Sequence, residues 1–83
     1  MQPILYQTDL KQEVLVFKTN LQTKKRVNEI APILNALSSL TTWSVDTQDI
    51  DNVLRVVTKG NLLESDVVDL LISHGFYCEA LED

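Results

Sequence analysis

The side chains best suited to metal chemistry are one histidine and one cysteine near the carboxyl end of the sequence. His74 and Cys78 lie four residues apart, and Met1 is the only methionine among the 83 residues. Thiolate and imidazole groups bind soft metals, so this pair is a candidate for a weakly held metal ion. The simpler interpretation makes Cys78 a small apolar core residue. His74 would then be a favourable partner for the negative end of a helix.

A second candidate site is the basic cluster Lys24-Lys25-Arg26, with Lys18 nearby in sequence. The segment from Thr19 to Arg26 leads into a predicted helix, whose free backbone N–H groups would add to the positive charge. This arrangement is suited to holding an anion or to contacting the acidic surface of a partner protein. The alternative is an ordinary solvated helix start.

The overall charge argues against nucleic acid as a partner. The chain has seven Lys and Arg residues and twelve Asp and Glu residues, which gives a formal net charge of −5. Phosphate backbones are bound by basic surfaces. Asp46, Asp49 and Asp51 form an acidic stretch that lacks the glycine and the terminal glutamate of a calcium loop, so we interpret it as a solvated turn.

The sequence predicts neither catalysis nor membrane insertion. It contains no glycine-rich phosphate loop, no Cys–His pair at motif spacing and no serine-centred elbow, so we expect no enzyme activity. Its longest apolar runs are about four residues, against roughly 20 for a membrane span. The first residues do not resemble a secretory signal. We therefore expect a cytoplasmic protein with a reduced cysteine and no cofactor.

Four short strands are predicted from β-branched and aromatic runs separated by polar segments. The polar segment 47–52 is expected to be a loop longer than a tight two-residue turn. The expected strands cover residues 14–17, 42–46, 53–57 and 76–81.

Two helices are predicted from apolar residues at helical spacing. The first spans residues 23–40, and Pro32 inside it predicts a kink or a regular helix that begins near Asn28. The second runs from a capping box formed by Asn61 and Glu64 to a left-handed cap at Gly75. The apolar stripe of the first helix consists of Val27, Ile30, Leu34 and Leu37.

The order strand, helix, strand, strand, helix, strand within about 70 residues predicts the ferredoxin-like βαββαβ fold. This α+β architecture has a four-stranded antiparallel sheet with both helices on one face. We expect a single domain over residues 13–83, preceded by an N-terminal extension at residues 1–12.

The chain resembles the heavy-metal-associated domain family, the small copper-chaperone-like modules also found at the N-termini of metal-pumping ATPases. The resemblance covers roughly residues 13–81. It rests on the helix stripe around Val27, on Trp43-Ser44-Val45-Asp46 before the strand at 54–57, and on the segment from Val67 to Gly75-Phe76.

The family's signature, a Met-x-Cys-x-x-Cys loop before the first helix, is missing. Asn20 and Thr23 stand at the two cysteine positions and Lys18 at the methionine position. Neutral oxygens are poor ligands for Cu(I), and a lysine repels cations. The resemblance therefore indicates a member of the family without its metal loop, and no bound metal is expected.

The same loop face meets partner proteins in the related chaperones, as the resemblance implies. We therefore expect a protein-interaction module whose contact face consists of Lys18, Asn20, Thr23, Lys24, Lys25 and Arg26. The alternative is a small-ligand module that holds an anion at the Thr19–Arg26 helix start or handles metal weakly through Cys78 and His74.

The alternation of side chains along the first strand suggests a second interaction surface, on the face of the sheet away from the helices. If Val14 and Val16 point to the helices, as the family match implies, Leu15 and Phe17 lie on the open face of the sheet. With Val53 and Val57 as neighbours, they would form an apolar patch that favours a homodimer or is covered by residues 1–12.

Overall fold

The computed structural model describes residues 12–81. The proposed extension at residues 1–12 lies outside this range, apart from Gln12. The chain forms, in order, β1(Glu13–Thr19), α1(Lys24–Asn35), β2(Leu40–Asp46), β3(Val53–Thr58), α2(Glu64–Ser73) and β4(Cys78–Ala80).

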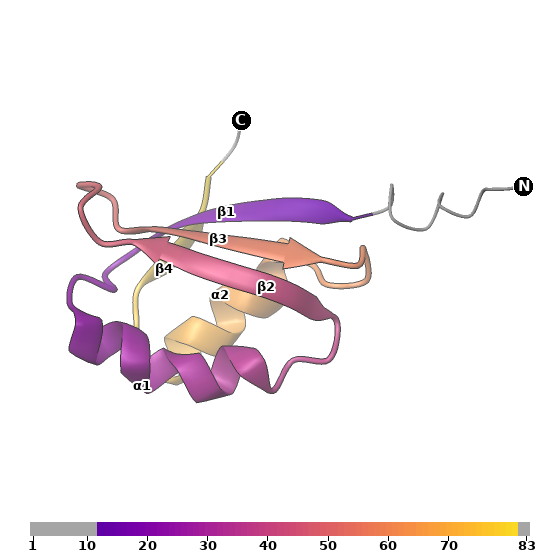
Figure 1. Ribbon diagram of the computed structural model, residues 1–83, viewed down its shortest axis with the longest axis horizontal. Helices are drawn as coiled ribbons and strands as arrows, with labels where there is room; N and C mark the ends of the chain where they lie inside the picture. Colours follow the sequence, from indigo (N-terminus) through magenta and orange to yellow (C-terminus); the bar gives the residue numbers. More distant parts are fainter. Residues whose placement is uncertain (1–11, 82–83) are drawn as a thin grey trace, which may run out of the picture.

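The four strands form one antiparallel sheet in the order β2-β3-β1-β4. Both helices lie on the same side of this sheet (Figure 1). The ferredoxin-like βαββαβ prediction is therefore confirmed. The two edge strands differ in length, since β2 has seven residues and β4 has three.

The face of β1 that meets the helices is the opposite of the one expected. Phe17 is fully buried in the core, whereas Val14 keeps 58% of its surface exposed. Residues paired across the sheet share a face, so Leu15 and Phe17 lie inward with their partners Val56 and Leu54. The prediction of an outward patch built on Leu15 and Phe17 was wrong. The physical reason is that the larger Phe17 ring gains more from burial than Val14 does.

The core lies between the sheet and the two helices. Phe17 shares this core with Leu21, Ile30 and Leu34. Leu21 belongs to the segment between β1 and α1, so the loop that carries the candidate site is anchored in the core. The remaining members are Leu54, Val56, Leu62, Val67, Leu71 and Cys78.

Helix α1 begins at Lys24 and ends at Asn35. Its N-cap is Thr23, whose Oγ1 accepts a hydrogen bond from the backbone N–H of Arg26 at 3.2 Å. Of the two alternatives predicted from Pro32, the regular helix that begins near Asn28 was wrong, since α1 begins four residues earlier at Lys24. The kink at Pro32 stays a prediction. The helix continues only three residues past Pro32, so it is shorter than the apolar stripe indicated.

Helix α2 starts later than its sequence suggested. Its N-cap is Leu63, and the Leu63 N–H donates to Oδ2 of Asp66 at 3.0 Å. The capping box predicted for Asn61 and Glu64 was therefore wrong by two residues.

At the other end of α2, the predicted left-handed cap is confirmed, since Gly75 has φ of +88°. The N–H of Phe76 donates to Leu71 O at 2.9 Å and closes the last turn as a Schellman motif.

Candidate functional site

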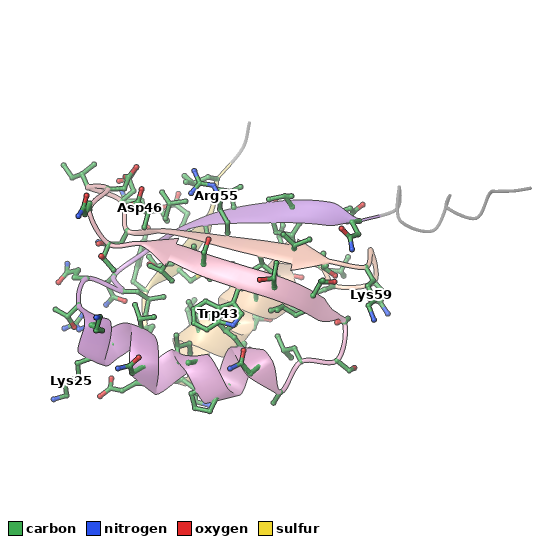
Figure 2. The ribbon with its side chains drawn as sticks, viewed as in Figure 1. Lys25, Trp43, Asp46, Arg55 and Lys59 are labelled. Atoms are coloured by element: carbon green, nitrogen blue, oxygen red, sulfur yellow. The ribbon has the colours of Figure 1, made fainter. Side chains whose placement is uncertain are left out.

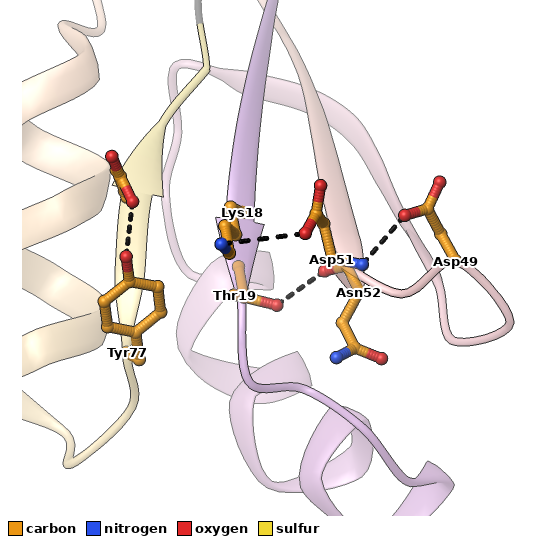
Figure 3. A network of polar contacts seen from close by, with 7 residues as sticks. Lys18, Thr19, Asp49, Asp51, Asn52 and Tyr77 are labelled. Carbon is orange, nitrogen blue, oxygen red and sulfur yellow. Dashed lines mark hydrogen bonds and ion pairs between the residues drawn. The ribbon is translucent and has the colours of Figure 1, made fainter.

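Three loops meet at one end of the sheet, and hydrogen bonds tie them together. Figure 3 draws one of these bonds, between Thr19 and Asn52. The Thr19 N–H donates to Asp51 O at 3.0 Å, and Thr19 Oγ1 donates to Asn52 O at 2.6 Å. Both bonds join the end of β1 to the β2–β3 loop. Asn20 Oδ1 accepts from the Tyr77 N–H at 3.0 Å, which connects the β1–α1 loop to the loop before β4.

The β1–α1 loop, residues 20–23, is also held by bonds of its own. The Leu21 N–H donates to Thr19 Oγ1 at 3.1 Å, and the Gln22 N–H donates to Asn20 O at 2.8 Å. The Arg26 guanidinium donates from Nη1 to the same Asn20 carbonyl at 3.0 Å. With Leu21 fully buried beneath it, the loop is fixed by polar bonds on one side and by the core on the other.

The predicted contact residues fall into three groups. Thr23 and Arg26 bond within the loop and the helix start, and the Asn20 side chain bonds to the Tyr77 N–H before β4. Lys24 and Lys25 are exposed, and no carboxylate of the described residues lies within 4.0 Å of either ammonium group. These two lysines are therefore the cations left available at the start of α1.

Lys18 does not lie with the other cations. Phe17 and Thr19 on either side of it point into the core, so Lys18 points to the open face of the sheet. Its Nζ lies 3.7 Å from Oδ1 of Asp51, with both side chains partly exposed (Figure 3). An ion pair of this kind contributes little to stability.

The acidic β2–β3 loop uses its carboxylates to form turns. Asp46 Oδ1 accepts from the Gln48 N–H at 3.1 Å, and Asp49 Oδ1 accepts from the Asp51 N–H at 2.8 Å (Figure 3). Side-chain oxygens that bond the backbone two residues on are typical of Asx turns. Within residues 12–81, no three His, Cys, Asp or Glu side chains gather as a metal site would require.

The cysteine and the histidine have separate surroundings. Cys78 is 4% exposed and packs in the core, and burial raises the pKa of its thiol to about 11. At neutral pH it is therefore a protonated thiol and not the thiolate that binds metals. His74 is exposed, and its Nδ1 lies 2.9 Å from Leu70 O in the last turn of α2. Both placements agree with the simpler interpretation of these residues.

Tyr77 belongs to this end of the molecule, although the sequence had not singled it out. Its hydroxyl donates to the carboxylate of Glu79, and this bond raises the pKa of the tyrosine (Figure 3). The two residues are two apart at the start of β4, so their side chains share a face. Their spacing of two residues could have indicated this contact from the sequence, but such a spacing is too common to identify a site.

A shallow hollow of about 200 Å³ lies beside the first turn of α1 and was also not predicted. Val27 of α1 and Val45 of β2 give it apolar walls, and Lys24 and Thr47 complete the lining. The hollow therefore combines apolar walls with the ammonium group of Lys24. The lysine comes from the predicted basic cluster, whereas Val45 and Thr47 come from a distant part of the sequence.

Comparisons with known proteins define the class of fold. No protein-family model matches the chain, and no curated protein matches it. Among solved structures it is similar to the apo HMA domain of a copper chaperone for superoxide dismutase, where HMA stands for heavy-metal-associated. The TM-score is 0.70 and the identity 18%, covering 86% of this chain and 68% of the other.

A second similar structure is the yeast copper transporter domain Ccc2a, solved in solution in apo and Cu(I)-loaded states. Its TM-score is 0.71 and its identity 20%, covering 84% of this chain and 96% of the other. At such identities the likeness establishes the fold. The chain therefore has the ferredoxin-like fold of HMA domains, and its single cysteine lies in the core.

Proposed function

We propose that this chain is a non-catalytic protein-interaction domain of the heavy-metal-associated type, without the metal loop of that family. Its contact surface is the start of α1, where Lys24 and Lys25 face solvent. The observation that carries this proposal is the β1–α1 loop, which is held by its own hydrogen bonds at both cysteine positions of the family pattern, Asn20 and Thr23.

A loop fixed in this way favours binding to a protein surface. Ordering a flexible loop during association costs free energy, and residues 20–23 are already tied to β1, to α1 and to Tyr77. The two lysines therefore project from a rigid base. This base is independent of metal, since Asn20 and Thr23 use their oxygens to accept backbone hydrogen bonds.

The partner surface is expected to be acidic. Exposed lysines attract carboxylates over roughly 8–10 Å at physiological salt, and Lys24 and Lys25 have no carboxylate partner among the described residues. One structural neighbour is described as part of a copper chaperone for superoxide dismutase, which by that description serves another protein. A partner protein of this chain would meet the corresponding loop face.

The proposal includes a cytoplasmic location and a domain spanning residues 13–83 after an extension at 1–12. No helix among the described residues is long and apolar enough to cross a bilayer. A homodimer through the open sheet face stays a prediction, with Val14, Val16 and Val57 now as its apolar residues. Sedimentation of the chain with and without residues 1–12 tests it, and a clean monomer in both cases excludes the dimer.

Charge reversal tests the contact surface. The double variant Lys24→Glu/Lys25→Glu leaves Arg26 in place, because Arg26 supports the loop through Asn20 O. The matched control is Arg55→Glu/Lys59→Glu, which makes the same charge change at two exposed residues away from the start of α1. Because Arg55 pairs with Val16 on the open sheet face, capture of a second copy of this chain is not counted as a partner. Figure 2 shows Lys25 and Lys59 at opposite ends of the molecule.

Proteins captured by the natural chain are quantified by mass spectrometry against both variants. We expect the Lys24/Lys25 variant to capture at least about tenfold less of a specific partner, because its new carboxylates would face the acidic surface of the partner and like-charge contacts cost several kcal/mol. The control should capture as much as the natural chain. Equal capture of every partner by all three proteins would show that the start of α1 is not the contact surface.

A further inference from the structure

The two edges of the sheet are protected to different degrees. Edge strands are usually shielded by being short, by Lys or Pro residues or by irregularities. Strand β4 is short, with three residues. Strand β2 has seven residues without Lys or Pro, and its only charged residue is Asp46 at its end. A register irregularity lies between Leu40 and Thr42, which leaves a regular edge from Thr42 to Asp46.

An aromatic ring and a hollow on the helix side of β2 accompany this edge. Trp43 lies between β2 and α1, where its Nε1 donates to Asn35 Oδ1 at 2.8 Å (Figure 2). Two residues further on, Val45 lines the hollow of about 200 Å³ together with Val27 and Lys24. A chain that ran along the β2 edge would therefore pass an aromatic ring, an apolar hollow and a lysine in turn.

We propose that an extended segment of a partner protein pairs with the outer edge of β2 as a fifth strand. Its main chain bonds to β2, one apolar side chain enters the hollow, and a carboxylate pairs with Lys24. This inference rests on the proposed function, since Lys24 belongs to both surfaces. Beyond that function, it specifies that the partner segment is an extended strand and which of its side chains face the hollow.

The side-chain pattern of the partner follows from strand geometry. Successive residues of a strand point to opposite faces, and the hollow lies on the helix side of the sheet, as Val45 does. The apolar residue and the acidic residue must both point to that side. They are therefore separated by one residue, which gives the pattern apolar, any residue, acidic.

Charge favours a separate partner over a second copy of this chain. Two β2 edges paired antiparallel would bring the Asp46 end of one copy beside the Leu40 end of the other. The residues near Leu40 include Ser39, whose carbonyl accepts from the Lys59 N–H at 3.1 Å. No carboxylate of residues 38–41 or 59 would meet Lys24 there, whereas an acidic peptide supplies one.

The test begins with a displayed library of random twelve-residue peptides selected on the full chain. We expect the enriched peptides to share the apolar, any residue, acidic pattern. One enriched peptide is then made in two N-methylated forms, one methylated at odd positions and one at even positions. A strand pairs with its neighbour through alternate residues, so each form blocks one edge of the peptide.

We expect one N-methylated form to bind at least about tenfold more weakly, because it loses two or more main-chain hydrogen bonds. The other form should bind within about twofold of the parent peptide. Lys24→Gln should weaken the parent peptide by about threefold or more, the effect of a partly exposed charge pair. Lys59→Gln, which changes an exposed lysine away from the hollow, should not.

Failure to enrich any peptide, or equal weakening by both N-methylated forms, would overturn strand pairing at β2. Selected peptides that bind Lys24→Gln as tightly as the natural chain would overturn the placement at the hollow. Either result leaves the proposed function standing if Lys24→Glu/Lys25→Glu still loses its protein partner. Self-association in sedimentation that the selected peptide abolishes would identify a second copy of the chain as the occupant and would overturn a separate partner.

Discussion

The loop end of this domain contains two kinds of polar residue, and they behave in opposite ways. Thr19, Asn20 and Thr23 use their side chains to hold the loops together. Lys24 and Lys25 lie next to them in sequence and have no carboxylate partner among residues 12–81. The first group determines the shape of the surface, and the second gives it a charge. Variants in the first group should therefore change stability, and variants in the second should change binding.

The largest effect on stability is expected for Thr19→Val. Valine keeps the shape of the side chain but removes the hydroxyl that donates to Asn52 O and accepts from the Leu21 N–H. Two buried polar groups would lose their partner, which costs about 2–4 kcal/mol of unfolding free energy. Urea denaturation measures this loss, with Thr42→Val at an exposed β2 position as the control. A loss no larger than the control's would contradict a structural role for the hydroxyl.

The second effect concerns Cys78 and depends on pH. Burial raises the pKa of this thiol from its ordinary value of 9.0 to about 11. Its contribution to stability is therefore complete below about pH 9 and is lost as the pH rises towards about 11. The unfolding free energy of the natural chain should fall more steeply over this window than that of Cys78→Ala. Parallel pH profiles would show that the thiol is not shielded from water.

A smaller effect is expected at the N-cap of α1. Thr23→Ala removes the oxygen that accepts from the Arg26 N–H and should cost about 1 kcal/mol. Thr23→Ser keeps that oxygen and should recover most of the loss. Thermal or urea unfolding of the two variants provides the comparison. If alanine and serine were equally destabilising, the methyl group of Thr23 and not its cap would be the cause.

The sequence predicted the order of elements because each has a local signal. The apolar spacing of α1, the Gly75 cap and the polar break at residues 47–52 all appear in the structure. The start of α2 was misplaced by two residues because Asn61 and Glu64 matched a cap that Leu63 and Asp66 form instead. Local patterns specify the existence of an element better than its ends.

The orientation of β1 could not be obtained from alternation, because residues 14–17 are apolar on both faces. The informative residue was Lys18, since a lysine side chain on this short domain belongs at the open face. Together with Thr19 in the core, it fixes Phe17 inward. The family resemblance implies the opposite orientation, with Val14 and Val16 inward, and that orientation was wrong.

The candidate site was predicted only in part. The basic cluster and the loop were visible in the sequence, but the bonds from Asn20 to Tyr77 and from Thr19 to Asn52 join residues 57 and 33 positions apart. Such contacts depend on the register of the folded sheet. The hollow between Val27 and Val45 depends on it in the same way.

Amide exchange in the metal-free chain shows whether the loop is held by its own hydrogen bonds. The reporting groups are the N–H groups of Leu21, Arg26 and Tyr77, which donate to side-chain oxygens at the loop. We expect all three N–H groups to be protected in chelator-treated protein, and one equivalent of Cu(I) or Zn(II) to leave their exchange rates unchanged. Protection that appears only after metal is added would contradict it.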